Sequence, residues 1–283
     1  MKSFPKKIAI IGLGLIGGSI ALGLKQHFGT KICILGNCHT LSRSKKAKKE
    51  GIIDEIFDIN KPDNGIKFYI IATPILQVPN ILSNLALQIK TGVVIMDVGS
   101  TKEFIIHSAK KILLPNITFI ASHPMAGSEM SGFENANPNL FRNKPWIVCT
   151  KKHHLITELT EILGAEMILM DAKIHDEYIS WASHLNLVSA SILTNTIGRQ
   201  KNWTEIAKIA STGFRDTTRL ASSNVEMKKD IIITNKENVI VSLIKFQKEI
   251  ELFINMLKSN DSSQIASYLS NAKTIRDNWI DKY

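Results

Sequence analysis

The sequence contains few cysteines. Its three, Cys33, Cys38 and Cys149, form no CxxC pair. Neither a disulfide framework nor a cysteine metal site is therefore supported, and we expect no bound metal. Reduced thiols of this kind are typical of cytosolic proteins, so we expect a cytoplasmic location.

Long apolar runs are also missing. The nearest candidate, residues 8–24, follows a basic start, but glycines interrupt it and no small-residue cleavage site follows. It is shorter than the roughly 20 apolar residues that a membrane-spanning helix needs. We interpret it as a strand, a turn and the start of a helix, and we expect no membrane association.

Acidic residues are fewer than basic ones, 25 against 35, which gives a net charge of +10. Such an excess can indicate nucleic acid, a membrane surface or an anionic small substrate. No basic patch with interleaved aromatic residues accompanies it, so we expect no nucleic-acid partner. The 283 residues, 44% of them hydrophobic, suffice for one large or two ordinary globular domains.

Short apolar segments alternate with helix-compatible sequence in the first part of the chain. Strands are expected at residues 8–11, 31–35, 67–74, 93–97 and 117–124. This alternation predicts βαβ units and a doubly wound, mainly parallel sheet with helices on both faces. Between two of these strands, Pro79 either kinks the helical stretch 75–89 or marks its real start.

The pattern changes near residue 170. From Asp171 onward we find helical apolar spacing and no convincing strand. The predicted fold is therefore an α/β Rossmann-type N-terminal domain, residues 1–170, followed by an all-α C-terminal domain, residues 171–283.

The segment Gly12-Leu13-Gly14-Leu15-Ile16-Gly17 has the GxGxxG pattern, and it lies between a predicted strand and a predicted helix. Gly12 permits the tight turn, Gly14 lets the backbone approach a pyrophosphate, and Gly17 lets helix and strand pack closely. The N–H groups at the helix start, those of Leu15 and Ile16 included, then face the phosphates. The pattern predicts a dinucleotide cofactor.

The residues after the second predicted strand bear on which dinucleotide is bound. NAD-binding sites place a carboxylate there for the ribose 2′-hydroxyl, whereas this chain has Asn37, with Arg43, Lys45 and Lys46 just beyond. A neutral residue with nearby cations suits a 2′-phosphate. We expect NADP in preference to NAD, unless these cations only form a solvated helix face.

Polar residues gather where the predicted parallel strands end. Besides Gly12 and Asn37, these ends carry Thr73-Pro74, Ser100 and His123. In open parallel sheets, ligands bind at that edge. We therefore expect Thr73 and Pro74 to border the cofactor and His123 to lie at its reactive end, with Ser100 on the neighbouring loop.

Six segments together resemble the prephenate/arogenate dehydrogenases of tyrosine biosynthesis, in the family's order and over nearly the whole chain. They are GLGLIGGS at 12–19, ATP at 72–74, DVGSTK at 97–102, SHPMAGSEMSG at 122–132, SHLNLVSAS at 183–191 and STGFRDTTR at 211–219. The resemblance implies oxidative decarboxylation of arogenate or prephenate, with hydride transfer to NADP or NAD. It also implies a homodimer formed through the C-terminal helices.

The same resemblance implies roles for particular residues. His123 would act as base or polariser of the ring hydroxyl, and Ser100 would orient His123 or that hydroxyl. Arg219 would pair with a substrate carboxylate. Arg215 is either a second anion ligand or a surface cation, and Asp216 would orient the local cations.

Three further positions concern the substrate. Glu129 is expected to gate or order the pocket, and His184 is either a substrate ligand or structural. Many prephenate-using relatives carry a second histidine three residues later, where this chain has Leu187. Because the segments around His184 and Arg219 look more like those of arogenate-preferring, NADP-linked relatives, we expect arogenate to be preferred.

Two other functions compete with this one. A β-hydroxyacid dehydrogenase shares the expected architecture but uses a lysine base on a helix. A nucleotide-sensing binding protein would keep the glycine pattern without catalysis. The HPMAGSE and GFRDTTR segments argue against the first, and the presence of His123, Ser100 and Arg219 argues against the second.

Overall fold

The computed structural model describes residues 4–89, 92–127, 130 and 132–282. The chain divides into two compact units, residues 1–236 and 237–283. Within the first unit, the change from strand to helix falls between Leu169 and Ala172. The domain boundary expected at residue 170 remains a prediction.

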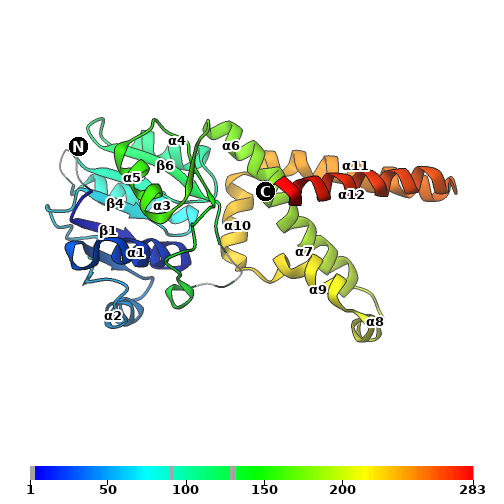
Figure 1. Cartoon of the computed structure of the whole chain (residues 1–283), viewed down its shortest axis with the longest axis horizontal. Coiled ribbons are helices and arrows are strands. Elements are labelled where there is room, and N and C mark those ends of the chain that lie inside the picture. The colour runs from blue at the N-terminus through cyan, green and yellow to red at the C-terminus, as the bar shows by residue number, and fades with distance from the viewer. Residues whose placement is uncertain (1–3, 90–91, 128–129, 131, 283) are drawn as a thin grey trace. The chain divides into compact units, whose positions relative to one another are not determined.

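In the described residues, one sheet has the strand order β3-β2-β1-β4-β5-β6-β7-β8. Figure 1 labels β1, β4 and β6 of this sheet. Its strands are β1 (Lys7–Ile11), β2 (Cys33–Asn37), β3 (Glu55–Ile56), β4 (Phe68–Ile71), β5 (Val94–Asp97), β6 (Thr118–Pro124), β7 (Pro145–Val148) and β8 (Glu166–Leu169). Neighbouring strands are parallel except for the antiparallel pair β6 and β7. The predicted doubly wound, mainly parallel sheet is confirmed.

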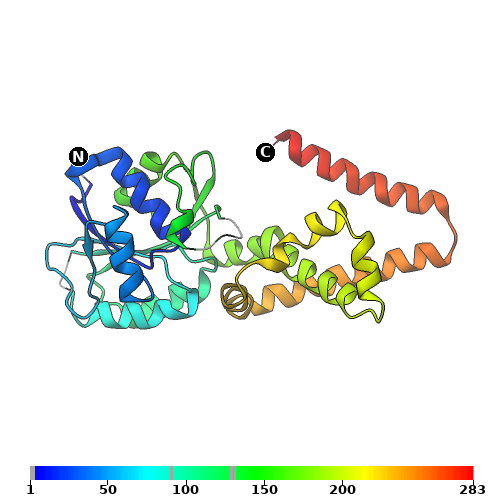
Figure 2. The same ribbon diagram turned by 90° about the horizontal axis from the view of Figure 1, so that it is seen from below.

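Helices cover both faces of this sheet (Figure 2). The helices of this part are α1 (Leu15–Phe28), α2 (Leu41–Lys49), α3 (Val78–Ala86), α4 (Glu103–Ile112) and α5 (His154–Leu163). Ile8 and Ile10 of β1 pack in one core with residues of α1 and α5, whereas Ala9 and Ile11 pack in the other with residues of α3 and α4. The two-residue period of a strand thus buries β1 on both faces.

Pro79 occupies the first turn of α3, which begins at Val78. A proline is tolerated there because its missing N–H would have no partner within the helix. Of the two alternatives left open by the sequence, the helix start is confirmed.

The chain after Leu169 is helical, which confirms the predicted all-α region. Its helices are α6 (Ala172–Ile179), α7 (Leu185–Gly198), α8 (Trp203–Ile209), α9 (Thr212–Thr218), α10 (Val225–Thr234), α11 (Lys236–Lys258) and α12 (Ser262–Lys282). A π-helical turn, η4 (Ser180–His184), joins α6 to α7, and a 3₁₀ turn, η5 (Arg219–Ser222), follows α9. In the part of the chain that the structure describes, no helix is both long and apolar enough to span a membrane.

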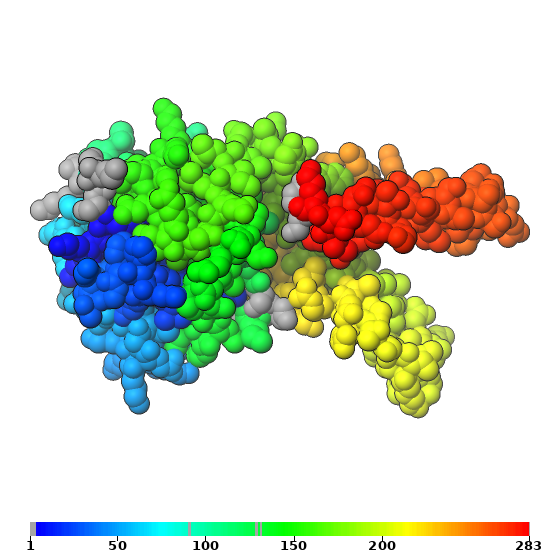
Figure 3. All heavy atoms as spheres, viewed as in Figure 1, coloured from blue at the N-terminus to red at the C-terminus, as the bar shows by residue number. Residues whose placement is uncertain are grey.

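Helices α11 and α12 make contact near the turn that joins them. The rings of Phe253 and Tyr268 lie 5.5 Å apart, and the Tyr268 hydroxyl donates to Glu249 at 3.0 Å. Away from the turn the two helices diverge (Figure 2), and α12 lies on the surface in the space-filling view (Figure 3). No residue of α12 is buried, and Leu269, Ile275 and Trp279 are exposed.

Candidate active site

His123 lies on β6, at the sheet edge where the parallel strands end. Its side chain is buried, with 8% of the residue surface exposed. The neighbouring strand β5 ends at Asp97, whose register partner is Ala121, and half-buried Ser100 follows three residues later. The structure therefore places His123 and Ser100 at the same edge, as expected from the strand ends.

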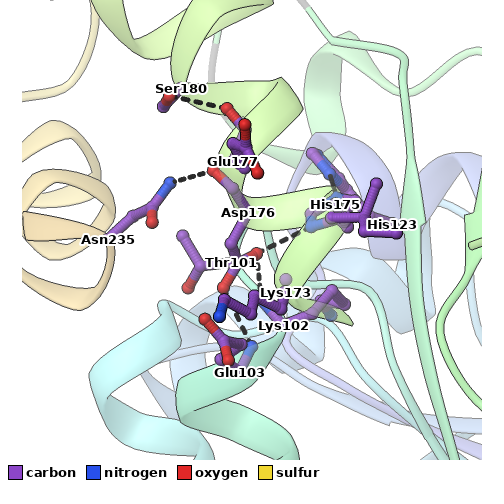
Figure 4. A network of polar contacts seen from close by, with 12 residues as sticks. Thr101, Lys102, Glu103, His123, Lys173, His175, Asp176, Glu177, Ser180 and Asn235 are labelled. Atoms are coloured by element: carbon purple, nitrogen blue, oxygen red, sulfur yellow. Dashed lines mark hydrogen bonds and ion pairs between the residues drawn. The ribbon is translucent and has the colours of Figure 1, made fainter. Parts of the chain in front are cut away.

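A second histidine supports His123 from the helical part of the chain. The Nδ1 atom of His123 lies 2.9 Å from Nε2 of His175, which is on α6. The Nδ1 atom of His175 lies 2.7 Å from Oδ1 of Asp176. His123, His175 and Asp176 thus form a linear chain of contacts, and all three residues are buried (Figure 4).

Asp176 is fixed by backbone groups as well as by His175. Its carboxylate accepts from the N–H groups of Lys102 at 2.8 Å and Glu103 at 2.9 Å, which open helix α4. A carboxylate is favoured at this position because the helix dipole and the free N–H groups are positive there. Asn235 donates to the carbonyl of Asp176 at 2.7 Å. The carboxylate that contacts His175 is thus held in one place.

A buried ion pair contacts the backbone of the residue before His123. The Lys102 ammonium contacts Asp97 and donates to the carbonyl of Ser122 at 2.7 Å, and neither charged side chain is exposed. Burial raises the pKa of Asp97, while the Lys102 ammonium and the N–H of Gly99 oppose that shift. Lys102 therefore fixes the strand residue next to His123 as well as pairing with Asp97.

His184 ends the π-helical turn and is buried. The amide nitrogen of Asn235 lies 3.2 Å from its Nδ1, so Nδ1 accepts and the neutral ring carries its proton on Nε2. Among the described residues, no group hydrogen-bonds this Nε2. Buried polar atoms normally find a partner, and a ligand group could supply one here. Leu187, one turn later on α7, is buried and offers no polar atom.

His123 and His184 are both neutral at physiological pH. Burial lowers the pKa of His123 well below its ordinary value, and the nearby Lys102 ammonium opposes protonation further. Burial also lowers the pKa of His184 to about 4. A neutral imidazole at the sheet edge is ready to accept a proton.

The glycine loop fits a bound dinucleotide. Gly12 has φ +97°, and a Cβ there would lie 2.6 Å from the carbonyl oxygen of Ala72, so only glycine is accommodated. A Cβ on Gly14 would meet nothing within 4 Å, which leaves open space beside the first turn of α1. Near this turn, the buried hydroxyl of Thr73 has no hydrogen-bond partner among the described residues. The free N–H groups at the start of α1 suit a pyrophosphate.

This geometry separates the roles of two glycines. We expect Gly12→Ala to lower the unfolding midpoint of the free protein, because its Cβ meets backbone. Gly14→Ala should leave that midpoint unchanged and weaken dinucleotide binding roughly tenfold or more, since its Cβ enters the ligand's space. Thermal unfolding and cofactor titration of both variants, with Gly198→Ala as the control, measure this. Equal binding by Gly14→Ala and the unaltered protein would contradict the assignment.

The predicted 2′-phosphate residues have partners within the protein. Asn37 Oδ1 accepts from the N–H of Gly12 at 3.2 Å. Arg43 and Lys46 of α2 both pair with Glu134, at 2.7 and 3.1 Å. The structure thus places the two cations together, with a carboxylate between them.

Comparison with known proteins identifies the family. The model for the prephenate dehydrogenase nucleotide-binding domain matches residues 20–173, and that for the prephenate dehydrogenase dimerization domain matches residues 171–271. A prephenate dehydrogenase of Lactococcus lactis is 34% identical over 96% of this chain and 77% of its own length. The chain belongs to the prephenate dehydrogenase family. It is therefore an NAD(P)-dependent oxidoreductase.

Solved structures of this family agree. The crystal structure of prephenate dehydrogenase from Aquifex aeolicus, in complex with hydroxyphenyl propionate and NAD⁺, has a TM-score of 0.89 and 29% identity, covering 98% of this chain and 99% of that one. The Synechocystis arogenate dehydrogenase has a TM-score of 0.78 and 26% identity, covering 96% and 99%. The family resemblance deduced from the sequence motifs is confirmed.

The remaining predicted substrate residues lie on η5 and α9. Arg215 and Asp216 are exposed and pair with each other at 2.9 Å, and Arg219 is exposed at the start of η5. No described hydrogen bond of Arg215 or Asp216 reaches His123, so their roles in this prephenate dehydrogenase family member remain predictions. Glu129 lies outside the described residues.

The polar network behind His123 was not expected from the sequence. It consists of Asp97, Lys102, His175, Asp176 and Asn235. One signal was present: the DVGSTK segment places an acid and a lysine directly after an apolar strand. A charge at that position in a buried sheet needs a partner. Nothing in the sequence marks His175 and Asp176 as its neighbours.

Proposed function

We propose that the protein oxidatively decarboxylates arogenate to tyrosine, with prephenate as the poorer substrate, and prefers NADP to NAD. The observation that supports the reaction is the neutral, buried imidazole of His123 at the ligand-binding edge of a dinucleotide-binding sheet. Leu187 supports arogenate, because it stands where many prephenate-using relatives carry a second histidine. We further propose a cytoplasmic location.

The bound nicotinamide supplies the hydride acceptor. The imidazole of His123 accepts the proton of the ring hydroxyl as hydride leaves the carbon that bears this hydroxyl. The bond to the ring carboxylate then breaks, CO₂ departs, and its electron pair completes the aromatic ring. His123 returns the proton to the phenolic oxygen. One CO₂ and one reduced cofactor form per substrate.

Other residues bind and orient the substrate. The Nε2–H of His184 is a buried donor without a protein partner among the described residues, and it would donate to a substrate oxygen. Arg219, with Arg215 as a second candidate, would pair with a substrate carboxylate, and Asp216 would hold Arg215. Ser100 would orient His123 or the ring hydroxyl.

Initial rates with the four pairs of arogenate or prephenate and NADP or NAD test the proposal. We expect the highest kcat/KM with arogenate and NADP. Comparable rates with prephenate would show that Leu187 does not decide the substrate. No reduced cofactor with any pair would overturn the proposed activity and favour a nucleotide-binding protein.

The cofactor preference depends on Arg43. Arg43→Gln should raise KM for NADP roughly tenfold and leave KM for NAD unchanged, because only NADP carries the 2′-phosphate. Glu134→Gln should lower KM for NADP, since Glu134 competes with that phosphate for Arg43 and Lys46. Lys49→Gln, an exposed change on the same helix, is the control. Equal effects of Arg43→Gln on both cofactors would contradict the preference.

We also propose a homodimer formed through the C-terminal helices. The family model that matches residues 171–271 is a dimerization domain. Exposed apolar residues on α11 and α12 support this, among them Ile244, Leu257, Leu269 and Trp279. Exposed apolar side chains along two helices favour a protein partner. Light scattering that returns the mass of a single 31.5 kDa chain would contradict it.

A further inference from the structure

The chain of contacts from Asp176 to His123 determines where each proton sits. Asp176 accepts two backbone N–H groups at the start of α4, where an ionised carboxylate is stabilised. An ionised carboxylate only accepts hydrogen bonds. The Nδ1 of His175, 2.7 Å from Asp176 Oδ1, must therefore carry a proton and donate it.

The place of the proton on His123 follows from its contact with His175. A neutral His175 with its proton on Nδ1 has only a lone pair on Nε2. That lone pair lies 2.9 Å from Nδ1 of His123, so this Nδ1 carries a proton and donates. A neutral imidazole carries a single N–H proton, and in His123 that proton is on Nδ1. The Nε2 of His123 therefore has a free lone pair.

We propose that His175 and Asp176 are positioning residues that lock His123 in the Nδ1–H tautomer, which keeps Nε2 as the acceptor for the substrate hydroxyl. This deepens the proposed function, because it rests on His123 being the base. Neutral histidine in water favours the opposite tautomer, so the protein must impose this one. The residues involved come from two separate parts of the chain, since His175 and Asp176 lie on α6 and His123 lies on β6.

The surroundings of His123 favour a neutral ring and leave its tautomer to His175. Lys102 is a buried cation beside it, and its partner Asp97 faces that ammonium. His184 is neutral and bonds to Asn235. Of these charged and titratable groups, His175 is the one within hydrogen-bond distance of the His123 Nδ1. Asp176 acts on His123 only through His175.

Nitrogen NMR of ¹⁵N-histidine-labelled protein tests the tautomer without any turnover. Protonated and unprotonated ring nitrogens differ widely in shift, and the His123→Asn variant assigns the signal. We expect His123 at neutral pH to show a protonated Nδ1 and an unprotonated Nε2, and His175 to show the same. A protonated Nε2 on His123, or an imidazolium, would overturn the proposal.

Variants at His175 connect the tautomer with catalysis. His175→Leu removes the acceptor, and we expect the Nδ1–H signal of His123 to be lost and kcat to fall roughly 100-fold with KM little changed. His175→Gln offers an amide oxygen as acceptor and should restore the Nδ1–H signal and most of the kcat. His107→Gln, an exposed change on α4, is the control.

The two proposals fail in different ways. A His123 Nδ1–H tautomer in a protein with no dehydrogenase activity would support the lock and overturn the proposed reaction. Full activity with His123 in the Nε2–H form would do the reverse. If His175→Leu does not fold, the comparison of His175→Gln with the unaltered protein still decides, because loss of the Nδ1–H signal there overturns the lock.

Discussion

We expect the replacement of His123 with asparagine to lower kcat by about 100- to 10,000-fold, the usual contribution of a positioned acid or base. The loss follows because Asn has no lone-pair nitrogen that can take the proton of the ring hydroxyl. KM should change little, since the substrate carboxylates are bound elsewhere. Initial-rate kinetics check both quantities, and His107→Gln is the matched control.

The pH profile of the unaltered enzyme sharpens this prediction. His123 accepts a proton only when it is neutral, so activity is present above its pKa and lost as the pH falls through it. Burial lowers that pKa well below the ordinary value of 6.5. The acid limb of kcat/KM should therefore lie below pH 6.5. A limb at or above pH 6.5 that disappears in His123→Asn would contradict the burial argument.

Removing the buried ammonium of Lys102 should cost about 3–5 kcal/mol of unfolding free energy, the usual cost of leaving one partner of a buried ion pair alone. Lys102→Met keeps the volume of the stem but leaves Asp97 without its partner and the Ser122 carbonyl without its donor. Denaturant unfolding measures the change. The double variant Asp97→Asn/Lys102→Met should recover most of the loss, because no unpaired charge remains.

Lys111→Met is the control, because Lys111 is exposed near the C-terminal end of α4, the helix that Lys102 precedes. It should leave the unfolding free energy nearly unchanged. If Lys102→Met is as stable as this control, the buried pair does not contribute as described. If the double variant is no better than the single one, the lost stability comes from the Ser122 contact rather than from the unpaired Asp97.

Much of the fold follows from the sequence. The strands at the centre of the sheet, such as β1 and β5, are continuous apolar segments between helical ones, so both their type and their parallel order could be predicted. The two-residue strand β3 and the last two strands, β7 and β8, were not predicted. β3 is too short to show a pattern, and three of the four residues of β8 are exposed.

Only part of the candidate site could likewise be predicted from the sequence. The places of His123 and Ser100 could be predicted because His123 lies at the end of an apolar strand and Ser100 lies three residues after one. His175, Asp176 and Asn235 could not, because their contacts join residues 52 to 74 positions apart and depend on how the helical part packs on the sheet. For Arg43, the sequence showed the cation but not its pairing with Glu134, 91 residues away.

In the proposed reaction, hydride transfer from the hydroxyl-bearing ring carbon accompanies loss of the ring carboxylate. Substrate carrying deuterium on that carbon and ¹³C in the ring carboxylate tests both events in one reaction. We predict deuterium in the reduced nicotinamide and one labelled CO₂ for each reduced cofactor. Labelled CO₂ without reduced cofactor, or reduced cofactor without deuterium, would contradict the proposed reaction.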